Sequence, residues 1–216
     1  MAVVTSSEVI NTGYAVLALI ADAIVLFTLI LFLVSRGSTP ARERWARFRD
    51  GVTPYALQLA WIVAVLATFG SLFLQYEEGL QPCTFCWFQR ICMYPLSLLL
   101  GIAAFRGDMQ VAKRYFLGLS AVGAVIAIYH YQLEHVPKEF SVCSLVPGDT
   151  PCNVAVINVF GFISVPFLSM AAFLLITTLL LVARGRNEEY EDEEEIDVIE
   201  TADETEPGDD TVPAPA

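Results

Sequence analysis

Five long apolar stretches dominate this chain and limit the folds that it can adopt. They cover residues 13–34, 55–74, 86–105, 113–131 and 157–183. They are 19 to 27 residues long, and a helix needs roughly 20 residues to cross about 30 Å of hydrocarbon. A chain with 56% hydrophobic residues is also too apolar for an ordinary soluble domain. The pattern predicts an all-α integral membrane helical bundle.

The net charge of -12 is unevenly distributed along the chain. Residues 187–216 carry fourteen Asp or Glu and no Lys or Arg, whereas residues 1–186 are nearly neutral. An acidic segment of this composition is expected to be disordered. We therefore expect three units: an N-terminal helix and basic loop in 1–54, a four-helix domain in 55–186, and a tail in 187–216.

The distribution of basic residues predicts the orientation in the membrane. The loops 35–54, 106–114 and 184–186 hold ten Lys or Arg, while the other side holds only Lys138 and, at the boundary, Arg90. Basic loops stay in the cytoplasm. We therefore expect a multi-pass cell-membrane protein with its N-terminus outside and its acidic tail in the cytoplasm.

The residues with the clearest chemistry lie where a polar loop becomes an apolar run. Cys83 and Cys86 are three residues apart, and Arg90 follows four residues after Cys86. The motif predicts a helix whose first turn holds Cys86, where the helix dipole favours a thiolate. Arg90 lies one turn further on the same face, and a cation at this depth indicates function. Together these residues predict a redox site facing an electron acceptor.

This motif resembles a known family. The pattern Pro82-Cys-x-x-Cys-x-x-x-Arg90 is similar to the first periplasmic loop of the DsbB family of membrane thiol–quinone oxidoreductases, and Cys86-Trp-Phe-Gln-Arg90 is similar to its BdbC-like branch. The run 157–166 also resembles that branch. The resemblance covers residues 55–183 and implies a DsbB-like four-helix core, which leaves one extra N-terminal transmembrane helix. It further implies a quinone, of the ubiquinone or menaquinone type, bound beside Arg90 and Cys86.

A second cysteine pair lies in the longest internal polar stretch. A Pro147-Gly148 turn between Cys143 and Cys152 would bring the two sulfurs within bonding range. On its own, such a pair is more often a structural disulfide. By the resemblance, a DsbA-like thioredoxin-fold thiol oxidase attacks Cys143. The Cys83–Cys86 disulfide then restores the Cys143–Cys152 disulfide, and Cys86 passes the electrons to the quinone.

Other candidate residues carry weaker signals. Cys92 lies about 240° around the helix from Cys86 and is expected to pack away from the site. His130 and His135 flank the outer end of the fourth span, and we interpret each as an ordinary interfacial residue rather than part of a quinone pocket. Asp22, inside the first span, is interpreted as a protonated or paired carboxyl.

Three other functions stay open at this point. The four outer cysteines could form an all-thiolate zinc site. A vitamin K epoxide reductase-like enzyme would share the helical bundle and the cysteine pairs, although its motif order differs. A non-enzymatic membrane protein with structural disulfides would explain the cysteines but not Arg90. No motif for nucleic-acid binding is present.

Overall fold

The computed structural model describes residues 6–77, 79–135, 152 and 158–183. Within them, five segments are long and apolar enough to cross a membrane. The elements are α1 (Ser6–Ser35), α2 (Thr39–Tyr76), α3 (Thr84–Arg106), α4 (Met109–Val111), η1 (Ala112–Phe116), α5 (Leu117–Leu133) and α6 (Val165–Val182). The elements α4, η1 and α5 together form one span, Met109–Leu133. The predicted all-α membrane bundle is confirmed. The acidic tail lies outside the described residues.

The second helix is longer than the sequence indicated. Residues 35–54 were expected to form a polar loop, but α2 starts at Thr39 and continues through Pro54 to Tyr76. Aromatic contacts hold this basic part of α2 against α1. The Trp45 ring lies 5.4 Å from the Phe32 ring, and the Phe48 ring lies 6.1 Å from the Phe27 ring. The expectation of a loop was wrong because these contacts stabilise a helix that the hydropathy pattern does not show.

The last helix is shorter than expected. We predicted a span from residue 157 that Pro166 interrupts, whereas α6 begins at Val165 with the proline in its first turn. Proline is favoured there because its missing N–H group would have no helical partner. Residues 159–163 instead form a turn, in which the backbone groups of Val159 and Ile163 exchange two hydrogen bonds of 3.0 Å.

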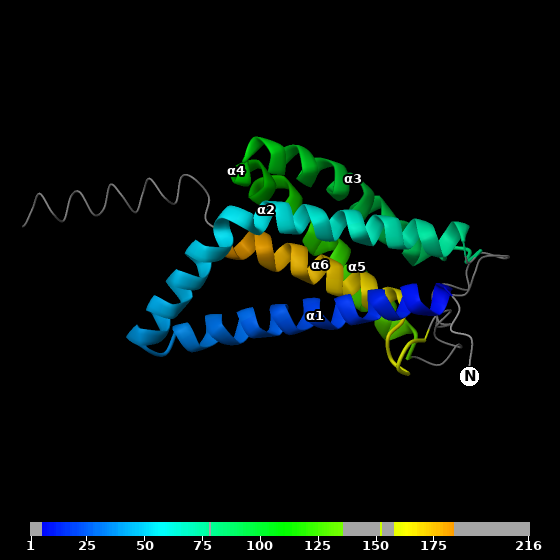
Figure 1. The fold of residues 1–216 in the computed structure, drawn as a ribbon, viewed down its shortest axis with the longest axis horizontal. Helices are drawn as coiled ribbons and strands as arrows, with labels where there is room; N and C mark the ends of the chain where they lie inside the picture. Colours follow the sequence, from blue (N-terminus) through cyan, green and yellow to red (C-terminus); the bar gives the residue numbers. More distant parts are fainter. Residues whose placement is uncertain (1–5, 78, 136–151, 153–157, 184–216) are drawn as a thin grey trace, which may run out of the picture.

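Helix α6 lies at the centre of the bundle and packs against α1, α2 and α5 (Figure 1). Its Phe173, Ile176 and Leu180 side chains are fully buried. Gly123 of α5 allows the closest approach, because a Cβ atom there would lie 2.3 Å from the Phe173 ring. The bundle therefore depends on small residues at its helix contacts.

One end of the bundle gathers the segments that carry the predicted site. The start of α1, the start of α3 and the end of α5 all lie at this end (Figure 1). The Cys83-x-x-Cys86 motif stands at the start of α3. The fold therefore brings the motif close to residues far away in the sequence.

Candidate functional site

The Cys83–Cys86 pair is formed by the start of α3. Cys83 is the residue before the helix, with extended backbone angles (φ -74°, ψ 171°). Its sulfur accepts a hydrogen bond from the backbone N–H of Cys86 at 3.4 Å. The two sulfur atoms lie 3.0 Å apart. The helix start thus places both thiols where a disulfide between them can open and close.

A buried histidine completes this cluster. His130, at the end of α5, is 2% exposed, and its Nε2 lies 3.6 Å from the Cys83 sulfur. On its other side, Nδ1 lies 3.1 Å from Nε2 of Gln89, and Oε1 of Gln89 accepts a hydrogen bond from Ser169 at 2.9 Å. Because the amide nitrogen can only donate, Nδ1 is the acceptor. The proton of the ring then lies on Nε2, which faces Cys83.

These contacts favour a thiolate at Cys83. Its hydrogen bond with the Cys86 side chain lowers the pKa of Cys83 to about 4; burial opposes the shift, and the His130 ring supports it. We had expected the thiolate at Cys86. The structure differs because α3 begins at Thr84, so the N–H group of Cys86 points at the Cys83 sulfur. Helix starts favour a negative charge at this position.

Arg90 lies one turn after Cys86 and is 9% exposed. Its Nε donates to the hydroxyl of Ser71 at 2.9 Å, and Nη2 donates to the carbonyl of Ser71 at 3.0 Å. Nη1 donates to the side chain of Gln75. Within the described part of the chain no carboxylate forms an ion pair with this guanidinium. A buried cation whose partners are neutral oxygens is suited to a ligand that carries or develops negative charge.

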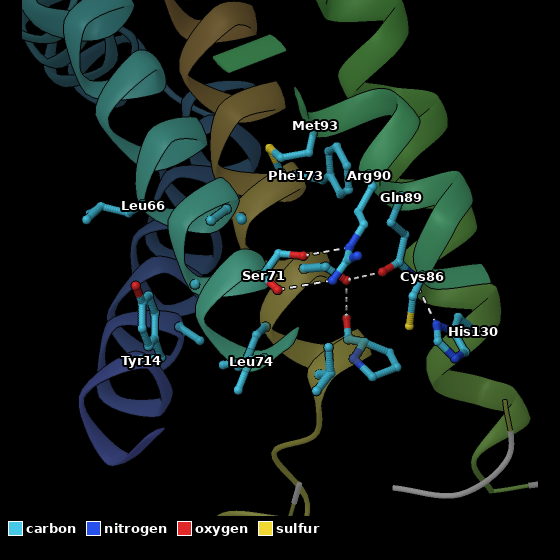
Figure 2. A pocket seen from close by; sticks show the side chains of 18 of the residues that line it. Tyr14, Leu66, Ser71, Leu74, Cys86, Gln89, Arg90, Met93, His130 and Phe173 are labelled. Atoms are coloured by element: carbon cyan, nitrogen blue, oxygen red, sulfur yellow. Dashed lines mark hydrogen bonds between the residues drawn. The ribbon is translucent and has the colours of Figure 1, made fainter. Parts of the chain in front are cut away.

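A cavity of about 310 Å³ connects these groups. Figure 2 shows Cys86, Gln89, Arg90 and His130 on one side of it, with Tyr14 of α1 across from them. Most of the wall is apolar and comes from α1, α2 and α6. Tyr94, also on the wall, has a buried hydroxyl without a hydrogen-bond partner among the described residues. An apolar cavity that holds a cation with neutral partners and a hydroxyl without a partner among the described residues fits a quinone, which has a flat apolar ring and two carbonyl oxygens.

An acidic residue lines the cavity where α5 ends. Glu134 follows α5 and accepts a hydrogen bond from the hydroxyl of Ser164 at 2.5 Å. Burial raises the pKa of Glu134, although the bond from Ser164 opposes the shift. The group therefore keeps its proton to a higher pH than a free carboxyl does.

The second cysteine pair is described only in part. Cys152 is 2% exposed, takes part in a disulfide, and belongs to the same buried cluster as Cys83. Cys143 and the predicted Pro147-Gly148 turn lie outside the described residues. The structure thus brings one member of each pair together.

The remaining predictions had mixed outcomes. Cys92 is a free thiol buried in the hydrophobic core and does not line the cavity, as expected. His135 is exposed and contacts Tyr131, which suits an interfacial residue. The interpretation of His130 as interfacial was wrong, and Gln89 was missed. One signal could have found His130, because Ala127 and Gly123 lie about one and two turns before it and mark an inward face of α5.

The three groups of the cluster would also suit a metal ion. The ligand atoms of Cys83, Cys86 and His130 lie within 4.8 Å of one another. Thiolate and imidazole are common zinc ligands. This set differs from the four-cysteine cage considered from the sequence.

The chain is similar to proteins of disulfide formation. A family model described as "Disulfide bond formation protein DsbB" matches residues 54–183. The "Disulfide bond formation protein C" of Bacillus subtilis (strain 168) is 44% identical over 133 residues, which cover 62% of this chain and 95% of that protein. A "Probable disulfide formation protein" of Oceanobacillus iheyensis is 44% identical, and the match covers 59% of this chain and 88% of that protein. A protein of the same description from Coxiella burnetii (strain CbuK_Q154) is 42% identical, and the match covers 60% of this chain and 87% of that protein. No solved structure matches the chain.

Proposed function

This chain belongs to the DsbB family and is a membrane oxidoreductase that forms disulfide bonds, and we propose that it passes electrons from an extracytoplasmic thioredoxin-fold thiol oxidase to a membrane quinone. The single observation that carries the proposal is the placement of Arg90. This guanidinium has no carboxylate partner among the described residues and lines the same apolar cavity as the Cys83–Cys86 pair. A cation at this depth has a cost that a bound acceptor would offset.

The proposed reaction starts at the second cysteine pair. A reduced dithiol of the partner attacks the Cys143–Cys152 disulfide at Cys143, and the partner leaves as a disulfide. Cys143 and Cys152 are then thiols and have taken up two electrons and two protons. They reduce the Cys83–Cys86 disulfide by thiol–disulfide exchange and become a disulfide again. The buried contact of Cys83 with Cys152 is the place for this exchange.

The last step occurs at Cys83 and Cys86. A bound quinone would accept the two electrons and two protons that this dithiol releases as its disulfide forms. Arg90 stabilises negative charge on an acceptor oxygen, and its fork is held in place by Ser71 and Gln75. His130 holds Cys83 as the thiolate, the reactive form in exchange. Glu134 lines the cavity, and its carboxyl can hold a proton because burial raises its pKa.

The orientation follows the charge pattern of the loops. We propose that both cysteine pairs face the outside, because ten of the twelve Lys and Arg residues fall in 35–54, 106–114 and 184–186, which the charge rule assigns to the cytoplasm. An oxidising compartment is also where disulfide formation takes place.

A coupled assay tests the function. The purified protein is mixed with a reduced Cys-x-x-Cys thioredoxin-fold protein and either ubiquinone or menaquinone. We expect one quinone reduced for each partner disulfide formed. Partner oxidation that proceeds equally well without quinone would refute the proposed acceptor.

Zinc binding is the second candidate because three suitable ligands stand together. It predicts about one zinc per chain by elemental analysis, released when His130 is replaced by Ala. Under this alternative the protein does not reduce quinone. Removal of zinc with a chelator would therefore not produce quinone reduction. A vitamin K epoxide reductase-like enzyme and a non-enzymatic scaffold are left without support by the family match.

A further inference from the structure

The first helix lies outside the region that the family model matches, yet it forms part of the cavity. The match covers residues 54–183, whereas α1 ends at Ser35. Helix α1 packs against both α2 and α6. In Figure 1 it runs along the bundle beside these helices. It therefore covers the side of the cavity that lies between α2 and α6.

Small residues seat α1 on the bundle. Ala15, Ala18 and Ala21 are 0%, 6% and 8% exposed. The Tyr14 ring packs on Gly70 of α2, where a Cβ atom would lie 2.9 Å from the ring. Such close contacts show that α1 has a defined position on α2 and is not loosely attached through lipid.

The part of the wall that α1 contributes is apolar and long. The residues from Leu17 to Ile24 that line the cavity are all aliphatic: Leu17, Ala18, Ile20, Ala21 and Ile24. From Tyr14 to Ile24 the helix rises about 15 Å along the bundle. Leu66 of α2 and Leu175 of α6 continue this apolar lining. The polar groups Arg90, Gln89 and His130 line the cavity too, so it has a polar part and an apolar part.

The apolar part also opens toward the membrane. Leu17, Ile20 and Ile24 line the cavity and are 50%, 51% and 43% exposed. A ligand whose ring lies near Arg90 could therefore extend a hydrocarbon chain along α1 and out into the bilayer. A tailless ligand would leave the apolar part of the cavity unused.

We infer that α1 is the tail-binding wall of the acceptor site, so that the isoprenoid tail of a bound quinone lies between α1, α2 and α6. This inference rests on the proposed function and adds to it the helix that contacts the tail of the acceptor. Ala18 and Ala21 leave the space for the tail, and Leu17 and Ile24 contact it. The extra helix then acts on substrate choice and takes no part in thiol exchange.

Binding of matched quinones tests the inference. Menaquinone-4 and menadione share one ring system, and only the former has an isoprenoid tail. The oxidised protein, without partner, is incubated with each in the same lipid nanodiscs, and retained quinone per protein is measured after gel filtration. Ala21→Phe, which fills the cavity from α1, should weaken retention of menaquinone-4 roughly tenfold, because burial of apolar surface supplies this affinity. Retention of menadione should stay as in the unmodified protein.

Matched variants on the same helix separate this effect from a general disturbance of α1. Ala23 is exposed and does not line the cavity, so Ala23→Phe should retain both quinones normally. The milder change Leu17→Ala should also weaken menaquinone-4 binding, whereas Leu19→Ala, which faces lipid, should not. If Ala21→Phe does not fold, Leu17→Ala still tests the inference. This variant is expected to fold because it only removes atoms from a half-exposed side chain.

Each outcome has a distinct meaning. Equal loss of both quinones in Leu17→Ala would overturn the inference, and so would unchanged binding of menaquinone-4 in folded Ala21→Phe. The inference would also be overturned by two results together. A lipid acyl chain would co-purify with the unmodified protein but not with Ala21→Phe, and the unmodified protein would retain no more menaquinone-4 than menadione. If the unmodified protein reduces menadione and the tail adds no affinity, only the inference fails. If it reduces no quinone at all, the proposed function fails.

Discussion

Nε2 of His130 lies 3.6 Å from the sulfur of Cys83, and the two side chains are 2% and 5% exposed. A buried ring that donates to a sulfur stabilises the thiolate, because the hydrogen bond is made in a poorly solvated place. Gln89 holds the ring from its other side. The contact joins α5 to the start of α3 and supports the thiolate form of Cys83, which the hydrogen bond with Cys86 also favours.

The pH dependence of Cys83 alkylation tests this contact. The pKa of Cys83 is lowered to about 4, so the sulfur is an anion above that pH and becomes protonated as the pH falls through it. In the reduced protein, alkylation of Cys83 by iodoacetamide should therefore persist in mild acid and decline only toward pH 4. His130→Ala should raise the pKa and move the decline to higher pH. Mass spectrometry of the Cys83 peptide gives the rate.

His135→Ala is the control for that profile, because His135 is exposed and contacts the backbone of Tyr131 instead. Identical profiles for the unmodified protein and His130→Ala would show that the ring does not stabilise the thiolate.

Replacement of Arg90 tests the acceptor site. Arg90→Ala should raise the KM for quinone about tenfold or more, since hydrogen bonds to charged groups contribute about 1.5–3 kcal/mol. Arg90→Lys should restore only part of this, because a single ammonium cannot replace the planar fork that Ser71 and Gln75 hold. Partner oxidation at saturating quinone should fall less. Arg106→Ala, at the exposed end of the same helix, serves as the control. An unchanged KM for quinone in both Arg90 variants would show that Arg90 is not part of the acceptor site.

Gly123 tests the packing that positions the site. Gly123→Ala would place a Cβ atom 2.3 Å from the Phe173 ring, so the buried ring or the two helices must shift. We expect a loss of about 1–3 kcal/mol in the free energy of unfolding, the usual range for overpacking. Gly118→Ala, at an open position on the same helix, should instead be neutral or slightly stabilising. Thermal unfolding of both variants in the same detergent checks this, and equal midpoints would show that the contact is not tight.

The orientation prediction rests on the ten-to-one distribution of basic residues. Protease added to intact cells should leave residues 187–216 in place, while permeabilised cells should lose them. An antibody to the C-terminal residues reports the cleavage. Removal of the tail in intact cells would reverse the proposed topology.

The sequence predicted those parts of the structure that depend on neighbouring residues. The spans follow from apolar length, and the position of Cys86 in the first turn of α3 follows from the polar-to-apolar boundary. The thiolate was expected on the wrong cysteine, because the start of the helix was not known to one residue. His130 and Gln89 were not recognised because their roles depend on contacts between α3 and α5, which no local pattern contains.

Other differences have the same origin. The helical part of α2 before Pro54 is stabilised by aromatic rings of α1, so its polar sequence indicated a loop. The start of α6 was expected eight residues too early, because hydropathy alone does not separate an apolar turn from a helix. The sequence of α1 did not predict that this helix lines the cavity, because the rest of the cavity wall comes from distant helices such as α2 and α6.

The central claim is that Cys83 and Cys86 connect partner thiols to a quinone, and the stoichiometry of partner oxidation and quinone reduction in serine variants measures it. Oxidised protein is mixed with a reduced Cys-x-x-Cys partner, and quinone absorbance is followed together with partner disulfide. Cys83→Ser and Cys86→Ser should each form one equivalent of partner disulfide from the Cys143–Cys152 bond with no change in quinone absorbance. Cys92→Ser, whose sulfur lies in the core away from the cavity, should reduce quinone for many turnovers like the unmodified protein. Continued quinone reduction in Cys86→Ser, or its absence in the unmodified protein, would contradict the account.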